Sequence, residues 1–153
     1  MGQDKIKLTI ELIPSSSFYN NVRSNVSKSE WDKIRKKCYA EADNKCEICS
    51  EQGTSQGFRH RVECHEIWNY DDKNKKQILE GFISLCPLCH KTKHIGLAFI
   101  QNQGERVINH MMKVNNLSHS KTENYIKESF VTFDSRSSYN WEVDISYIEK
   151  YME

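Results

Sequence analysis

Cys46-Glu47-Ile48-Cys49 and Cys86-Pro87-Leu88-Cys89-His90-Lys91-Thr92-Lys93-His94 are the two stretches around which the chain is organised. Each contains a Cys-x-x-Cys pair, and two such pairs supply the four thiolates that bind one tetrahedral Zn²⁺. The gap between the pairs is longer than in the simplest zinc ribbons, so we expect a strand hairpin between them. The sequence therefore predicts a closed structural zinc site with the ligands Cys46, Cys49, Cys86 and Cys89.

Three histidines in the same segment form a second candidate metal site. His90 and His94 are four residues apart, so on a helix they project from one face. His65 lies upstream in Val62-Glu63-Cys64-His65-Glu66-Ile67-Trp68, which we interpret as a strand. Imidazoles presented by one strand and one helix can hold a metal ion that is separate from the cysteine zinc.

Together these motifs resemble the HNH, or ββα-metal, nuclease superfamily, in the branch whose finger is held by two Cys-x-x-Cys knuckles. The matching stretches are Cys46–Cys49, Glu63–Ile67 and Leu85–His94, and the segment they span is roughly a third of the chain. Three further stretches resemble small bacterial HNH endonuclease-like proteins: Trp31-Asp32-x-Ile34-Arg35, Trp68-x-Tyr70-Asp71-Asp72 and Arg136-Ser137-x-x-x-Trp141. The resemblance implies an α+β fold with a zinc-stabilised ββα-metal finger. It also implies hydrolysis of DNA phosphodiester bonds, with Mg²⁺ or another divalent ion at the histidines.

In this superfamily, a metal ligand and the general base are adjacent on the first strand, and the helix supplies the remaining ligands. Two alignments fit the sequence. Either Cys64 takes the ligand position and His65 is the base, or His65 is the ligand and Glu66 is the base. The first keeps a histidine as the base, which suits proton transfer near neutral pH, and we favour it on sequence alone. The second places aliphatic Ile67 after the base, as in the family. The candidate catalytic residues are His65, Glu66, His90 and His94.

One position departs from the family pattern. Many members carry an asparagine that orients the base nine residues before the first helix histidine, and here that residue is Gly81. This departure keeps two other functions open. One is a non-catalytic zinc-finger module that binds nucleic acid without cutting it, and the other is a protein-interaction subunit of a larger system.

Composition limits where a partner can bind. The 153 residues carry a formal net charge of +1, so contacts to DNA must come from local patches rather than a global basic field. We expect phosphate contacts from a helix face and from lysines beside the histidines, namely Lys33, Lys36, Lys37, Lys91 and Lys93. A single site would nick one strand, so a duplex break would need a homodimer or two events. A partner protein is a further expectation.

The chain has neither an apolar run long enough to span a membrane nor the apolar region of a signal peptide near Met1. We therefore expect a cytoplasmic, reducing location, where six cysteines favour metal binding over disulfides. Cys38 lies on the apolar stripe of a predicted helix, so we interpret it as a buried small hydrophobe rather than a ligand.

We expect one domain with three regions. Residues 1–45 hold a strand over 6–12, predicted from alternation, and a basic helix over 28–43 whose capping box is Ser27 and Glu30. Residues 46–98 form the HNH finger, with a short helix just before Gly81 and a strand at 82–85. Residues 99–153 form a helical extension packed on the core, with a capping box at Ser120 and Glu123 and a late strand over 141–145.

Overall fold

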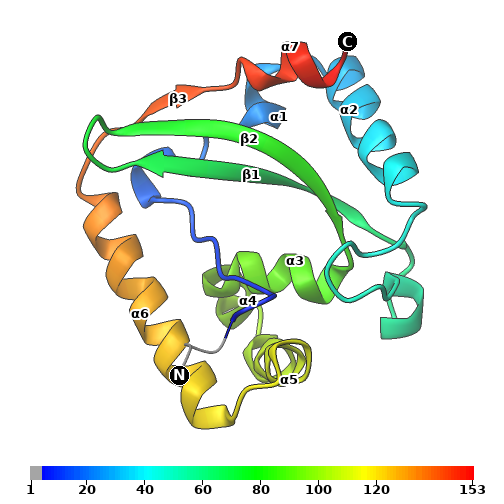
Figure 1. The fold of residues 1–153 in the computed structure, drawn as a ribbon, viewed down its shortest axis with the longest axis vertical. Helices are drawn as coiled ribbons and strands as arrows, with labels where there is room; N and C mark the ends of the chain where they lie inside the picture. The colour runs from blue at the N-terminus through cyan, green and yellow to red at the C-terminus, as the bar shows by residue number, and fades with distance from the viewer. Residues whose placement is uncertain (1–4) are drawn as a thin grey trace.

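A long antiparallel hairpin forms the centre of the computed structural model, which describes residues 5–153 (Figure 1). Its strands are β1 (Glu63–Asp71) and β2 (Lys76–Leu85), and the tight turn between them places Lys75 in the left-handed region at φ 56°. The third strand, β3 (Glu142–Asp144), pairs in parallel with β2, which gives the order β1-β2-β3. The chain is therefore α+β, as predicted, and β3 confirms the predicted late strand.

The hairpin register places the functional part of β1 opposite the end of β2. His65 pairs with Ile83 and Ile67 pairs with Gly81, and the register shifts between Ile67 and Trp68. The short helix predicted just before Gly81 is wrong, because β2 continues through this segment. Its burial alternates, with Gln77 and Leu79 buried and Glu80 exposed, as a strand requires.

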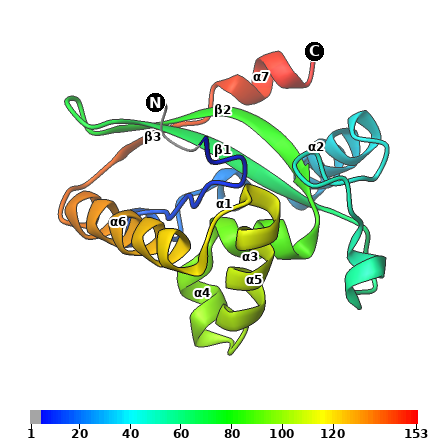
Figure 2. The ribbon, with the colours of Figure 1, turned by 60° about the horizontal axis from the view of Figure 1, so that its bottom comes forward.

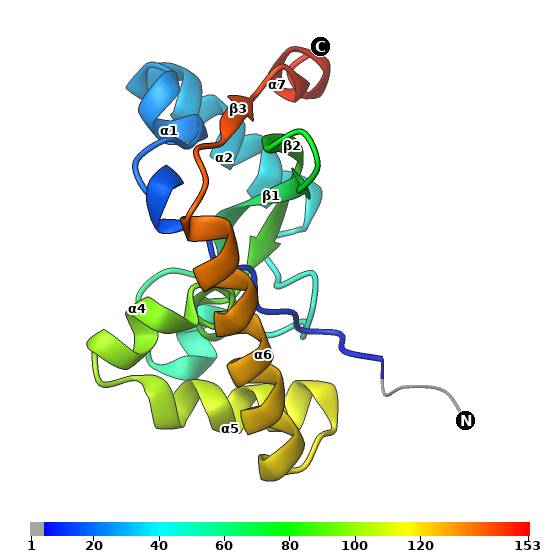
Figure 3. The same cartoon turned by 90° about the vertical axis from the view of Figure 1, so that its left-hand side faces the viewer.

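Helices surround the hairpin. They are α1 (Val22–Asn25), α2 (Lys28–Glu41), α3 (Pro87–Lys93), α4 (Ile95–Ile100), α5 (Gly104–Asn115), α6 (His119–Ser137) and α7 (Tyr147–Tyr151), with short 3-10 turns at Ser15–Ser17 and Gly53–Gln56. Helices α3, α4 and α5 lie together on one side of the hairpin, whereas α7 lies on the other side (Figure 2). Figure 3 shows α6 running along one flank of the molecule, from the region of α5 toward β3.

The helix predicted over 28–43 is α2, and its start follows the predicted chemistry. The Ser27 side chain accepts a hydrogen bond from the Glu30 amide at 3.1 Å, which satisfies one free donor of the first turn. Ile34 and Cys38 are buried along one face of α2, so Cys38 is a core residue as expected. The capping box predicted at Ser120 and Glu123 lies two residues too late, because α6 is capped by Ser118.

The strand predicted over residues 6–12 is wrong. The segment is extended and its apolar side chains point inward, but its backbone groups bond to helices and side chains instead of a neighbouring strand. The Glu11 amide donates to the Lys93 carbonyl at 3.1 Å, and the Ile10 amide donates to the Tyr125 hydroxyl at 2.8 Å. The Leu8 amide and carbonyl both bond to the Asn115 side chain. Alternation here reflects packing over α3, α5 and α6.

Two apolar clusters form the core. The larger one includes three of the four knuckle cysteines and joins the knuckles to α4, α5 and α6 through residues such as Leu85, Ile95, Val107 and Met111. The smaller one consists of Val22, Ile34 and Leu79, with Trp31 and Trp68 packed against it, so it fixes α1 and α2 on the hairpin.

Within residues 5–153, no helix is both long enough and apolar enough to cross a membrane.

Candidate metal centres

The two Cys-x-x-Cys pairs converge on one point. The sulfur atoms of Cys46, Cys49, Cys86 and Cys89 all lie within 4.8 Å of one another. The Sγ atoms of Cys49 and Cys86 are 3.5 Å apart, close to the roughly 3.8 Å that separates sulfurs bound at about 2.3 Å to one tetrahedral ion. All six cysteines of the chain are free of disulfides. The four thiols can therefore hold a metal ion, and soft ligands in this number suit Zn²⁺.

Backbone geometry prepares both pairs for this role. The Cys49 amide points at the Cys46 sulfur at 3.5 Å, and the Cys89 amide points at the Cys86 sulfur at 3.4 Å. Cys86 is also the N-cap of α3, and Pro87 occupies the first helical turn. The first knuckle is attached to the hairpin because the Glu47 amide donates to the Ser84 carbonyl at 2.9 Å. The backbone therefore directs an amide at one sulfur of each pair, those of Cys46 and Cys86.

One more side chain touches the cysteine site. His110 is buried on α5, and its Nε2 lies 3.2 Å from the Cys89 sulfur. An imidazole N–H at that distance can donate a hydrogen bond to a thiolate and reduce the negative charge of the cluster. His110 could not be predicted from the sequence, because nothing in its local pattern links α5 to the knuckles.

The second predicted cluster is also brought together. Ring nitrogens of His65, His90 and His94 lie within 4.8 Å of one another, and the three ring centroids are 5.0–5.3 Å apart. β1 supplies His65 and α3 supplies His90, while His94 lies where α3 ends and α4 begins. All three line a cavity of about 200 Å³. The histidine cluster therefore borders a cavity.

Two of the three imidazoles are held by carboxylates. Nε2 of His65 is 3.0 Å from Oε1 of Glu11, and Nδ1 of His90 is 2.9 Å from Oε1 of Glu63. Such pairs fix the ring and its tautomer, which leaves Nδ1 of His65 and Nε2 of His90 for a metal. Burial alone would raise the pKa of Glu11, but the hydrogen bond to His65 and the charge of Lys93 lower it to about 2. Glu11 is therefore a carboxylate at neutral pH.

Two of the histidines, His65 and His94, are kept neutral. Burial lowers the pKa of His65, although its hydrogen bond to Glu11 opposes the shift. Burial and the neighbouring charges of His90 and His65 lower the pKa of His94 to about 3. Neutral imidazole is the form that binds metal, so protons do not compete for His65 and His94 at pH 7.

Cys64 and Glu66 flank His65, and their surroundings differ. Cys64 is buried, and its thiol hydrogen-bonds with that of Cys38, so it is absent from the ligand cluster. Both residues line the histidine cavity, but only Glu66 is anchored there by backbone, since its Oε1 accepts the Val22 amide at 3.0 Å. Burial raises the pKa of Glu66, and the amides of Val22 and Arg23 only partly offset this shift. This placement favours the alignment with His65 as ligand over the one we preferred from sequence.

Gly81 has no orienting role in this arrangement. It lies in β2 opposite Ile67, and a Cβ added there would meet only the Ile67 side chain, at 3.7 Å. Glu11 and Glu63 do the orienting instead. Glu63 is only two residues before His65, but Glu11 is 54 residues away, so no local motif could identify it.

The five predicted phosphate contacts are in different environments. Lys33 and Lys36 are exposed on α2, as expected. Lys93 is a correction, because its side chain is 4% exposed and bonds to Glu11 and to Thr9. Lys37 is partly exposed, but its ammonium already bonds to the Tyr151 carbonyl and lies 4.4 Å from the Tyr151 ring centroid. Lys91 is half-buried beside Phe58.

In comparisons with protein-family models, curated proteins and solved structures, the chain has no match.

Proposed function

We propose that this protein is an HNH-type, metal-dependent endonuclease that hydrolyses DNA phosphodiester bonds. The observation that carries the proposal is the histidine cavity. Three converging imidazoles and the Glu66 carboxylate line one cavity beside a hairpin that is followed directly by a helix. A purely structural metal site needs neither an open face nor an adjacent carboxylate without a cationic partner.

Each residue has a distinct role in this proposal. His65, His90 and His94 would hold a divalent ion, which would supply positive charge to the scissile phosphate. Three imidazoles suit Zn²⁺ or Ni²⁺ better than Mg²⁺, which prefers oxygen ligands. Glu11 and Glu63 keep two of the rings in place. Glu66 is the general base, and burial raises its pKa toward the range in which a carboxylate accepts a proton efficiently. The four cysteines hold a structural Zn²⁺ and fix the start of α3.

The reaction balances with water as the only co-reactant. A water oxygen forms a bond to phosphorus while the bond from phosphorus to one bridging oxygen breaks. Glu66 accepts the proton of the attacking water, and the leaving oxygen takes a proton from solvent. Because one histidine cluster serves one phosphodiester, a monomer nicks a single strand.

Nicking of supercoiled plasmid by purified protein tests the proposal. We expect relaxed circles with at least one of Mg²⁺, Mn²⁺, Ni²⁺ or Zn²⁺, and no nicking with chelator. His94→Ala should abolish nicking because it removes a metal ligand. The matched control is His119→Ala, since His119 is exposed on α6 and far along the chain from the cluster. It should nick like the unaltered protein.

Failure of the unaltered protein to nick with any of the four metals would overturn the proposal. If the protein then still binds DNA, the non-catalytic nucleic-acid module becomes the better interpretation. If it neither cuts nor binds DNA, the interpretation as a protein-interaction subunit replaces it. Equal nicking by His94→Ala and the unaltered protein would instead place the chemistry elsewhere.

A further inference from the structure

A second hollow continues from the histidine cavity along α2. Arg23 and Trp31 line the histidine cavity together with His65 and Glu66. The same two residues line an adjoining cavity of about 470 Å³, whose other walls are Lys28, Asp32 and Arg35. Both cavities are bounded by Arg23 and Trp31, so they adjoin at these two residues, and we call the two cavities together the α2 groove.

Arg23 is the first charged residue along this groove from the histidines. Its backbone amide and that of Val22 bond to the Glu66 carboxylate, so the position of its backbone is fixed relative to the proposed base. Its side chain is exposed, and among residues 5–153 it has no carboxylate partner. Arg35, by contrast, is paired with Asp32 at 2.9 Å. The free guanidinium of Arg23 is therefore the one available to an anion from outside.

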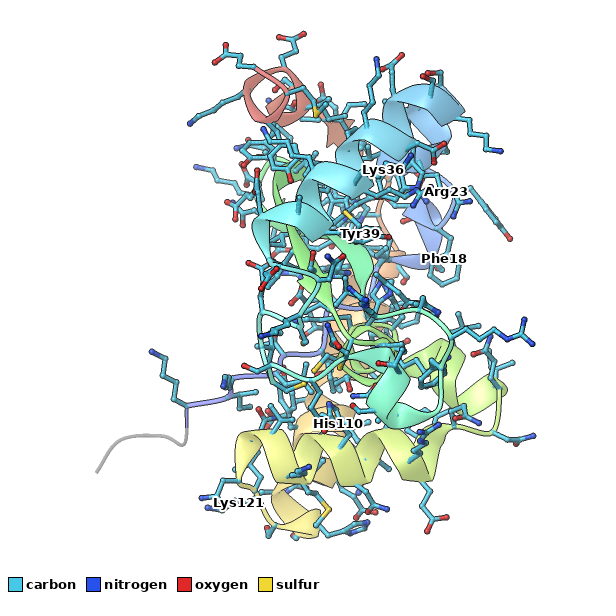
Figure 4. All side chains as sticks on the ribbon, turned by 90° about the vertical axis from the view of Figure 1, so that its right-hand side faces the viewer. Phe18, Arg23, Lys36, Tyr39, His110 and Lys121 are labelled. Carbon is cyan, nitrogen blue, oxygen red and sulfur yellow. The ribbon has the colours of Figure 1, made fainter. Side chains whose placement is uncertain are left out.

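Positive charge continues beyond Arg23. Lys28, Lys33 and Lys36 line a further shallow hollow on α2, with Ser29 and Asp32. Figure 4 shows Arg23 and Lys36 extending from α1 and α2 at the same end of the molecule, far from His110 on α5. A chain of phosphates that leaves the histidines along the groove would meet Arg23 first and the lysines of α2 afterwards.

We propose that Arg23 binds the backbone phosphate that flanks the scissile one, and that the substrate strand continues over Trp31 to Lys28 and Lys36. This inference rests on the proposed function, since it takes the histidine cavity as the place of the scissile phosphate. Guanidinium suits this contact because its planar fork matches two phosphate oxygens. The contact reads no bases, so it positions the strand without selecting a sequence.

Salt-dependent DNA binding tests the path. A fluorescently labelled duplex is titrated with protein in buffer without added divalent metal, so that the DNA stays intact. We expect Arg23→Ala to lower the slope of log affinity against log salt by about one, and to do so equally on unrelated sequences. Lys28→Ala and Lys36→Ala should each act in the same direction. Lys127→Ala is the matched control, because Lys127 is exposed on α6 and lies outside the groove.

Arg23→Lys separates charge from shape. It should keep the slope of the unaltered protein but bind more weakly than arginine, because an ammonium lacks the planar fork. The inference is overturned if Arg23→Ala has the slope and nicking rate of the unaltered protein, or if the unaltered protein shows no salt-dependent binding. If Arg23→Ala keeps both the nicking rate and the slope of the unaltered protein, the proposed nuclease function stands and only the proposed path of the strand over Arg23 is excluded. Binding that depends on Arg23 without any nicking supports the path and removes the nuclease.

Discussion

His65 and Glu66 are neighbours in β1 with different partners. His65 is 3% exposed and turned toward His90 and His94, whereas Glu66 is anchored by backbone amides at the start of α1. The amides of Val22 and Arg23 stabilise the charged carboxylate, whereas burial has the larger effect and raises the pKa of Glu66. In the proposed function the general base is therefore Glu66, one residue along the strand from His65, which we favoured as base from the sequence.

Glu66→Gln separates the two roles. The amide keeps the size of the side chain but cannot accept a proton, so we expect the nicking rate to fall roughly 10²–10⁴-fold, the usual range for general-base catalysis. Binding of the catalytic ion should persist, because His65, His90 and His94 are unchanged. Single-turnover nicking and metal titration measure both effects. Glu80→Gln is the matched control, since Glu80 is exposed on β2 and should have no effect.

The same residue predicts a pH dependence. Burial raises the pKa of Glu66 above its ordinary value of 4.5, and the base acts only when deprotonated. Activity should therefore be complete above the raised pKa and fall as the pH decreases through it, with the midpoint above pH 4.5. A nicking profile that stays flat down to pH 4.5 would contradict Glu66 as the base. In Glu66→Gln the residual rate should lose this acidic limb.

Local patterns in the sequence identified the ligands of the cysteine and histidine clusters, because metal sites need particular side chains at short spacing, but they did not identify Glu51 and His110, which form a third group of potential ligands with Cys49. The four cysteines and three histidines are brought together as the motifs predicted. The partners that orient them could not be found in this way. Glu11 reaches His65, and His110 reaches Cys89, only because α3 and α5 pack together and the N-terminal segment crosses α3. Such long-range contacts leave no periodic signal.

Among the larger elements, the N-terminal segment shows why alternation misled the prediction. An alternating pattern of apolar and polar residues indicates which side chains point inward, but it does not indicate which groups hydrogen-bond to the backbone. Here Asn115, at the end of α5, takes the place of a neighbouring strand. Its Oδ1 accepts the Lys7 and Leu8 amides at 3.1 and 2.7 Å, and its Nδ2 donates to the Leu8 carbonyl at 3.1 Å.

Asn115→Ala should therefore detach this segment. It leaves the backbone groups of fully buried Leu8 without partners, so we expect a loss of about 2–4 kcal/mol in the free energy of unfolding. Chemical denaturation measures the loss. Asn109→Ala is the matched control, because Asn109 is exposed on the same helix and should change stability little. Since Glu11 lies on the segment, Asn115→Ala should also weaken metal binding at His65. Equal stability of Asn115→Ala and Asn109→Ala would contradict the role of Asn115 in holding the N-terminal segment.

The cysteine site is part of the main apolar core, so we expect the stability of the whole molecule to depend on it. Cys46, Cys86 and Cys89 belong to the larger apolar cluster, together with residues from α4, α5 and α6. The smaller cluster around Val22, Ile34 and Leu79 includes none of the knuckles. Metal at the knuckles therefore joins the first loop, the end of β2 and the start of α3 inside the main core, and it indirectly fixes the histidine cavity on that helix.

Loss of this metal should unfold most of the chain. Structural zinc contributes about 10–16 kcal/mol in zinc-finger peptides, which is comparable to the roughly 5–15 kcal/mol that stabilises a whole domain. Cys46→Ser and Cys89→Ser should therefore each contain less zinc, as measured by atomic absorption. Both variants should also lose the helical circular dichroism signal at temperatures where the unaltered protein is folded. Cys38→Ala should keep its zinc, because Cys38 contacts Ser84 and Cys64 rather than the knuckles. Protein that is folded without stoichiometric zinc would contradict the coupling.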